Sequence, residues 1–131
     1  MRKILGLLAL CASFVLADMR TIDVSPEVIK SGAPIVDVRT KGEWESTGVV
    51  KDSMLITFFN EQGSFDTKAF IAELNKRQIS KDKELMILCQ SGRRSAKVSE
   101  LLSQEGYKVV NLQGGIKSLI AQGYQTTPYK P

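Results

Sequence analysis

Short apolar runs alternate with amphipathic segments along most of the chain, and this alternation constrains the fold more than any other feature. Residues 34–38, 84–88 and 108–112 are rich in β-branched and aliphatic side chains, as strands buried on both faces are. Residues 66–77 and 95–105 instead place apolar side chains at helical spacing. Strands that alternate with helices predict an α/β domain with an open, mostly parallel sheet of about five strands and helices on both faces.

Weaker signals complete the expected order of elements. Ser25 is a typical N-cap residue, and Pro26 fits the first position of a helix. Further strands are expected over residues 20–24 and 54–58, a short helix or turn over 40–46, and a last helix after the turn at 114–115. The length of 131 residues, with 43% hydrophobic and 24% charged residues, fits one globular domain.

The beginning of the chain predicts a signal peptide over residues 1–17. Arg2 and Lys3 form a basic start, residues 4–16 are almost wholly apolar, and the segment ends in a small residue where cleavage is expected. The sequence therefore predicts a domain over residues 18–131 in a periplasmic or secreted protein.

Two alternatives to cleavage stay open at this point. A retained membrane anchor is one, although the apolar run is shorter than the about 20 residues that a membrane span needs. A lipid attached to Cys11 is the other, although Leu10 before it is larger than the residue usual at that position. If the segment is removed, no stable membrane insertion is expected.

The charge of the chain gives no reason to expect nucleic acid as a partner. Lys plus Arg number 18 against 14 Asp plus Glu, and loss of Arg2 and Lys3 with the signal leaves 16 against 14, a net charge of +2. No run of five or more basic residues exists, whereas nucleic-acid binding usually needs a basic patch or stripe.

The cysteine and histidine counts restrict the chemistry. The chain contains no histidine, which excludes Cys–His dyads, Ser–His–Asp triads and most zinc sites. Without Cys11 the only cysteine is Cys89, so an exported chain would carry a single thiol that cannot form an internal disulfide. Any cysteine chemistry must therefore activate this thiol without an imidazole.

The loop after the expected strand at 84–88 is the best candidate site, because ligands of open α/β sheets bind beyond the carboxyl ends of the strands. Gly92 lets the loop curl so that backbone N–H groups converge on one point, and the following helix adds its positive end there. Two arginines strengthen this field, which favours thiolate over thiol. The loop runs Cys89, Gln90, Ser91, Gly92, Arg93, Arg94 and Ser95, with Ser95 expected to support the helix as a cap.

A plainer interpretation of these residues exists. Cys89 could be a small apolar residue that ends a buried strand, and Arg93 and Arg94 could be solvated residues at a helix start. Cations are disfavoured at helix N-termini, however, so two arginines there point to an anion that they hold.

Three segments form a recognisable pattern. In chain order they are Asp-Val-Arg at 37–39 followed by Glu43, Cys-x-x-Gly-x-Arg-Ser at 89–95, and Leu-Gln-Gly-Gly-Ile at 112–116 followed by Gly123 and Tyr124. Together they resemble the single-domain rhodaneses, including small periplasmic members, over about residues 20–125. The family often has Gly-His where this chain has Gly48-Val49, and Trp where it has Leu119, which implies differences in packing.

The resemblance implies a thiosulfate sulfurtransferase that holds sulfane sulfur as a persulfide on Cys89. The residues from Gln90 to Arg94 would bind a small anionic sulfur donor, with Arg94 on its oxyanion part and Arg93 at the rim. The acceptor would be cyanide, a small thiol or a protein, and neither a metal nor an organic cofactor is implied.

Other residues have structural interpretations. We expect Arg39 and Glu43 to form an ion pair that fixes a surface turn. Trp44 is expected to pack, as are Phe58 and Phe59, although these two could also line an apolar rim near the site.

Three alternative functions remain open. A cysteine phosphatase or arsenate reductase would use a related loop with Arg six residues after Cys, where this chain has Ser95. A periplasmic persulfide carrier would use the same chemistry with protein partners. A non-catalytic module would use the same fold only for binding.

Overall fold

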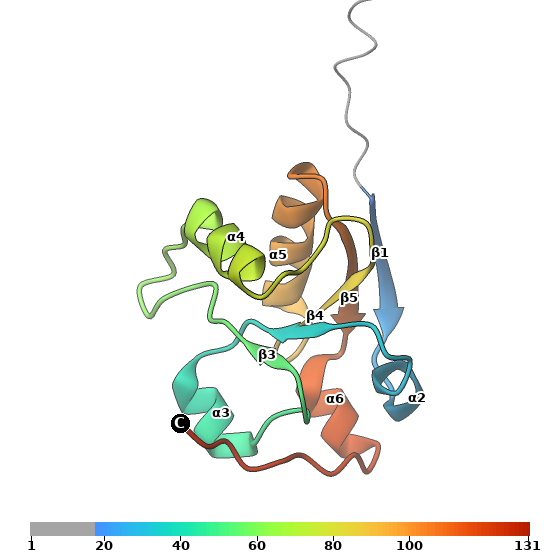
Figure 1. Ribbon diagram of the computed structural model, residues 1–131. Helices are drawn as coiled ribbons and strands as arrows, with labels where there is room; N and C mark the ends of the chain where they lie inside the picture. The colour runs from blue at the N-terminus through green and yellow to red at the C-terminus, as the bar shows by residue number, and fades with distance from the viewer. Residues whose placement is uncertain (1–17) are drawn as a thin grey trace, which may run out of the picture.

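Five strands form a single parallel sheet in the order β1–β5–β4–β2–β3 (Figure 1). The computed structural model describes residues 18–131, so the expected signal peptide lies outside the described residues. All four strand pairs are parallel, which confirms the α/β prediction. The strands are β1 (Asp18–Asp23), β2 (Ile35–Asp37), β3 (Met54–Leu55), β4 (Leu85–Leu88) and β5 (Lys108–Gln113).

Helices cover both faces of the sheet, as expected. In the view of Figure 1, α4 and α5 lie above the sheet, and α2, α3 and α6 lie below it. Of the helices within residues 18–131, none is long and apolar enough to cross a membrane. The helices are α2 (Pro26–Ile29), α3 (Lys41–Thr47), α4 (Thr67–Lys76), α5 (Arg93–Gln104) and α6 (Gly115–Ala121).

The central strand β4 divides the core into two hydrophobic clusters. Its Leu85 and Ile87 join the cluster under α4 and α5, and its Met86 and Leu88 join the cluster on the α6 side. Successive side chains of a strand point to opposite faces, so a strand covered on both sides needs apolar residues at every position. This is why residues 85–88 are uniformly apolar and all buried.

Local capping signals set the helix starts. Ser25 Oγ accepts a hydrogen bond from the N–H of Val28, 3.1 Å away, as expected for an N-cap. Thr40 and Glu43 form a reciprocal capping box at the start of α3. Asp66 caps α4 through the N–H of Ala69.

Among the boundaries that differ from expectation, two have a clear physical cause. Helix α5 begins at Arg93, two residues before the expected start, because Gly92 adopts a left-handed conformation (φ +102°) that turns the chain directly into the helix. The expected cap role of Ser95 is therefore wrong. Strand β3 covers only two residues of the expected 54–58, because its partner β2 ends at Asp37, opposite Leu55.

The carboxyl ends of the parallel strands share one edge of the sheet. Cys89 follows β4 there, Val38 and Arg39 follow β2, and the turn at Gly114 follows β5. The three segments of the sequence pattern, although far apart in the chain, therefore meet at this edge.

The chain end runs back across α3 (Figure 1). Val49 and Thr127 form an antiparallel bridge with two hydrogen bonds of 2.8 Å. Trp44 is buried against Tyr129, with ring centroids 5.6 Å apart, which confirms its packing role. Residues 126–129 thus brace the helix that contributes Glu43 to the site.

The register of α5 can be tested with two leucines that the sequence places on its inner face. Leu102 is fully buried, whereas Leu101 is only partly buried. We expect Leu102→Ala to lower the free energy of unfolding by about 3 kcal/mol and Leu101→Ala by about 1 kcal/mol, because the cost scales with the cavity left behind. Denaturant unfolding measures both, and equal losses would contradict this register.

Candidate active site

The sulfur of Cys89 is surrounded by polar groups despite its burial. Its Sγ accepts hydrogen bonds from the backbone N–H groups of Gly92 (3.1 Å) and Ser95 (3.3 Å). The thiol also donates to Ser95 Oγ at 3.3 Å. Cys89 is 1% exposed, which an inert core cysteine would share. The converging N–H groups distinguish this thiol from such a residue, because they stabilise negative charge on sulfur.

Helix α5 aims its first turn at this sulfur. The earliest N–H groups of a helix have no partner inside it and carry its partial positive charge. That of Ser95 is used by the sulfur. Within residues 18–131, four further N–H groups of this segment donate to no protein atom, and they belong to Gln90, Ser91, Arg93 and Arg94.

Helix α6 supports the loop from below. The N–H groups of Ile116 and Lys117 donate to the carbonyl oxygens of Cys89 (2.9 Å) and Gln90 (3.0 Å). In a trans peptide the C=O and N–H groups point in opposite directions. Carbonyls held against α6 therefore turn the N–H groups of Gln90 and Ser91 away from α6.

This support requires a glycine at the start of α6. Gly115 has φ +63°, and a Cβ added to it would lie 2.6 Å from the carbonyl oxygen of Cys89 and closer still to that of Gln90. Similarly, a Cβ at Gly92 would lie 3.0 Å from the backbone nitrogen of Gly114. The Gly-Gly turn and the cysteine loop thus pack backbone against backbone.

Arg39 is a buried hub rather than half of a surface ion pair. It is 0% exposed, and its Nε and Nη2 atoms bind the equally buried carboxylate of Asp37 at 2.9–3.2 Å. Its remaining N–H groups donate to Thr47 Oγ1 (2.8 Å), the carbonyl of Gly48 (3.0 Å) and Gln90 Oε1 (3.1 Å). The expected pairing of Arg39 with Glu43 is wrong, because Arg39 reaches only the backbone carbonyl of Glu43.

The carboxylate of Glu43 binds Arg94 instead. Two parallel hydrogen bonds, of 2.8 and 2.6 Å, join Arg94 Nη1 and Nη2 to its two oxygens. The hydrogen bond from Arg94 lowers the pKa of Glu43 to about 2, and the same bond raises the pKa of Arg94. Both terminal nitrogens of Arg94 are thus engaged, whereas Arg93 is exposed and, among residues 18–131, forms no ion pair.

Sequence reasoning missed the roles of Asp37 and Gln90 in this network. Asp37 and Arg39 lie two apart at the end of a buried strand, which places both on the same side. Two opposite charges in that position, directly after apolar residues, are the signal for an internal pair. No pattern in the sequence indicates the hydrogen bond from Arg39 to the side chain of Gln90, because the two residues lie 51 positions apart.

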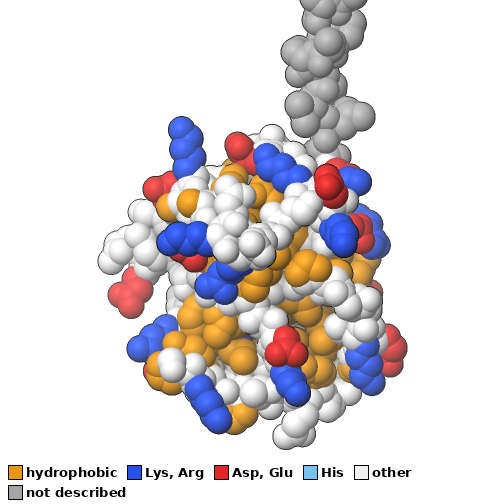
Figure 2. Space-filling model, viewed as in Figure 1, with side chains coloured by type: hydrophobic (Ala, Val, Ile, Leu, Met, Phe, Trp, Pro, Cys, Tyr) orange, Lys and Arg blue, Asp and Glu red, His pale blue; other side chains and the backbone are white. Residues whose placement is uncertain are grey.

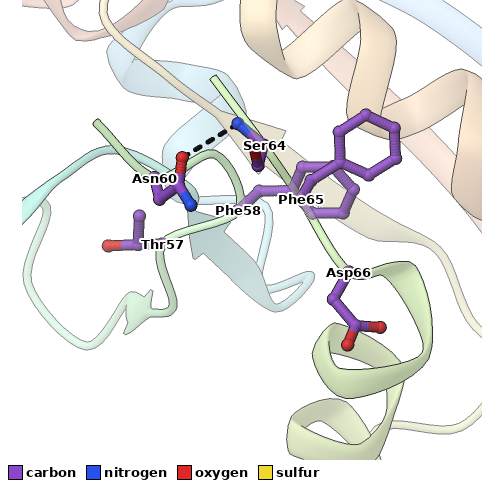
Figure 3. Close-up of a pocket in the computed structure, with 6 residues that line it drawn as sticks. All are labelled: Thr57, Phe58, Asn60, Ser64, Phe65 and Asp66. Atoms are coloured by element: carbon purple, nitrogen blue, oxygen red, sulfur yellow. Dashed lines mark hydrogen bonds between the residues drawn. The ribbon is translucent and has the colours of Figure 1, made fainter. Parts of the chain in front are cut away.

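A pocket of about 380 Å³ lies beside the site, past the end of β3 (Figure 3). Thr57 links it to the site, because its hydroxyl donates to the carbonyl of Arg39 at 2.7 Å. Phe58 is buried in the core as expected, while Phe65 stacks on it and remains 46% exposed. The lining residues are Thr57, Phe58, Asn60, Ser64, Phe65 and Asp66.

The surface in Figure 2 carries basic and acidic side chains interspersed, without a large region of one sign on this face. Any attraction for an anion on this face is therefore local. Helix α5 begins with two arginines, Arg93 and Arg94, in the turn that follows the sulfur.

Comparison with known proteins places these features in one family. The rhodanese-like domain model matches residues 22–122. The chain belongs to the rhodanese-like domain family. A rhodanese-like domain protein from Staphylococcus aureus has the same fold, with a TM-score of 0.60 at 27% identity over 83% of this chain and 99% of that one.

Two curated relatives of this rhodanese-like domain are similar over parts of their lengths. A sulfurtransferase from Allochromatium vinosum is 31% identical over 83 residues, which cover 63% of this chain and 66% of the relative. The putative sulfurtransferase YtwF from Bacillus subtilis is 45% identical over 38 residues, covering 29% and 37%. Both matches span less than two thirds of the relative's own length.

The Glu43–Arg94 pair predicts a specific loss of stability in acid. A depressed carboxyl pKa stabilises the folded state above the unfolded value, here 4.5, and this contribution disappears as the pH falls towards 2. Between about pH 5 and pH 2 we expect the native protein to lose on the order of 2 kcal/mol more than Glu43→Gln does. Thermal unfolding across this range measures the difference.

The matched control for that experiment is Glu45→Gln. Glu45 lies on the same helix and is exposed, so this variant changes the net charge equally without touching Arg94. Parallel pH profiles for the native protein and Glu43→Gln would contradict the importance of the pair.

The support from α6 predicts an asymmetry between two glycines. Gly115 and Gly123 both have positive φ, but a Cβ at Gly123 would meet nothing within 4 Å. Both alanine variants should therefore carry backbone strain of about 1 kcal/mol. Gly115→Ala should lose at least about 2 kcal/mol beyond this, since backbone must move. Denaturant unfolding of both variants measures these losses of stability. Similar losses for Gly115→Ala and Gly123→Ala would contradict the close packing of Gly115 against the cysteine loop.

Proposed function

We propose that this protein is a sulfurtransferase that carries sulfane sulfur on Cys89. The observation that carries the proposal is the convergence of two N–H groups on Cys89 Sγ at the carboxyl edge of the sheet. The names of the two curated relatives, both sulfurtransferases, support the same reaction class. A thiolate held in this way can act without the histidine that the chain lacks.

The proposed reaction has two halves. The Cys89 thiolate attacks the outer sulfur of thiosulfate or a similar donor, and the new S–S bond forms as the old one breaks. Sulfite leaves with the electron pair of the broken bond. Cyanide or another thiol then attacks the outer sulfur of the persulfide, takes it away, and leaves Cys89 as a thiolate.

The loop residues have separable roles in this proposal. The N–H groups of Gln90, Ser91, Arg93 and Arg94 are free to bind the oxygens of the donor and the outer sulfur, on which negative charge persists. Arg94 adds its charge while its two terminal nitrogens hold Glu43. The exposed Arg93 is therefore the arginine that we propose for first contact with an anionic donor.

The cellular context belongs to the same proposal. The apolar segment at residues 1–17 supports export to the periplasm or beyond. The sulfur donor would be a small anion, and the acceptor a small thiol or a protein thiol. The nearly balanced charge of the chain, which has no run of five or more basic residues, gives no support for nucleic acid as a partner.

A phosphatase is the nearest rival reaction. Its loop needs an arginine free to clamp a tetrahedral phosphate, but here both terminal nitrogens of Arg94 bind a carboxylate. The four free N–H groups and the compact turn at Gly92 favour a sulfur-sized anion.

Intact mass after incubation with thiosulfate tests the proposal. The native protein should gain the mass of one sulfur atom and lose it again on addition of cyanide. Cys89→Ser should gain nothing, and Arg93→Gln should load sulfur about tenfold more slowly at low salt, because it lacks the exposed charge. Sulfur transfer by Cys89→Ser, or aryl phosphate hydrolysis in place of sulfur loading, would overturn it.

A further inference from the structure

Asn111 is a buried polar residue in an otherwise apolar stretch of β5. It is 3% exposed, and its neighbours Val109, Val110 and Leu112 are buried and apolar. The strand register places it beside Ile87 of β4, on the face covered by α5. A buried side-chain amide costs free energy unless it is hydrogen-bonded, so its partner shows what it does here.

That partner is Ser95, which also contacts the reactive sulfur. The hydroxyl of Ser95 donates to Asn111 Oδ1 at 2.6 Å, and the same Oγ accepts from the thiol of Cys89 at 3.3 Å. A serine hydroxyl has one hydrogen to donate. While that hydrogen points at Asn111, Oγ presents only lone pairs to the sulfur. Such lone pairs can accept a hydrogen bond from the S–H group of a thiol, but they repel the negative charge of a thiolate.

An amide has a carbonyl end and an NH₂ end, and the carbonyl end of Asn111 is the one that binds Ser95. We propose that Asn111 is a positioning residue that acts through Ser95 Oγ: its Oδ1 holds the serine hydrogen while Cys89 is a thiol and releases it to the sulfur when Cys89 is a thiolate. No hydrogen passes between Ser95 and Asn111, and the proton that Cys89 loses goes to solvent.

The use of such a reversal rests on the proposed function. During sulfur transfer Cys89 Sγ alternates between an anion before attack and an uncharged sulfur within the persulfide. The Ser95 hydroxyl would donate to Sγ in the first state and return to Asn111 in the second. Asn111 would thus adjust the polarity around Sγ as its charge changes.

The charged groups around this chain stay constant when Asn111 is changed. Arg94 is close enough to Cys89 and Asp37 to interact with their charges, and it is paired with Glu43, while Asp37 is paired with Arg39. The chain Sγ–Oγ–Oδ1 touches none of these side chains, so replacing Asn111 by an apolar residue isolates the effect of the amide.

The test is a double-mutant cycle on the rate at which iodoacetamide alkylates Cys89, measured between about pH 5 and pH 9. Asn111→Leu removes the competing acceptor, so the Ser95 hydroxyl turns to the sulfur. On the acid limb of the profile, alkylation should become roughly fivefold faster. Ser95→Ala should slow it, and adding Asn111→Leu to Ser95→Ala should change nothing more.

Other outcomes would overturn the proposal. These are an unchanged or slower rate in Asn111→Leu, or an equal acceleration with and without Ser95. Asn111→Ala has the same expected result and replaces Asn111→Leu if that variant does not fold, as judged by circular dichroism. Sulfur loading of the native protein from thiosulfate is measured in parallel, because its failure would refute the sulfurtransferase proposal while leaving the alkylation result to decide the role of Asn111.

Discussion

The hydrogen bonds between the first turn of α6 and the carbonyls of Cys89 and Gln90 determine the direction in which the N–H groups of the cysteine loop point. They hold two peptide planes, and each plane then turns its N–H group away from α6. A loop of the same sequence without this support would have no reason to gather its donors on one side. The electrostatics of the sulfur therefore depend on contacts with Ile116 and Lys117, each 27 residues further along the chain than its partner in the loop.

The buried pair of Asp37 and Arg39 supports the opposite side of the loop at an energetic cost. Removing two charges from water is expensive, and their mutual attraction compensates only when the remaining hydrogen bonds are also made. Arg39 meets this condition by binding Thr47, Gly48 and Gln90. The charge thus joins β2, α3 and the cysteine loop, which apolar side chains of the same volume could not orient.

Sequence reasoning recovered the elements whose cause is local. The uniform apolar run of β4, the cap at Ser25 and the glycine in the cysteine loop each carry their own signal, and the parallel sheet followed from their order. The errors concern pairing across the fold. Glu43 lies four residues from Arg39 but binds Arg94, 51 residues away. Ser95 was expected to cap the helix, whereas its hydroxyl binds Cys89 and Asn111. Spacing along a chain cannot rank partners that only tertiary structure brings together.

The return of the chain end across α3 has a practical meaning for anyone handling the protein. Thr127 is bridged to Val49 and Tyr129 packs on Trp44, so these C-terminal residues belong to the framework that holds α3. An affinity tag or reporter joined directly to residue 131 would disturb the contacts of Thr127 and Tyr129 with Val49 and Trp44, and with them the helix that carries Glu43. A spacer after Pro131 would leave those contacts intact.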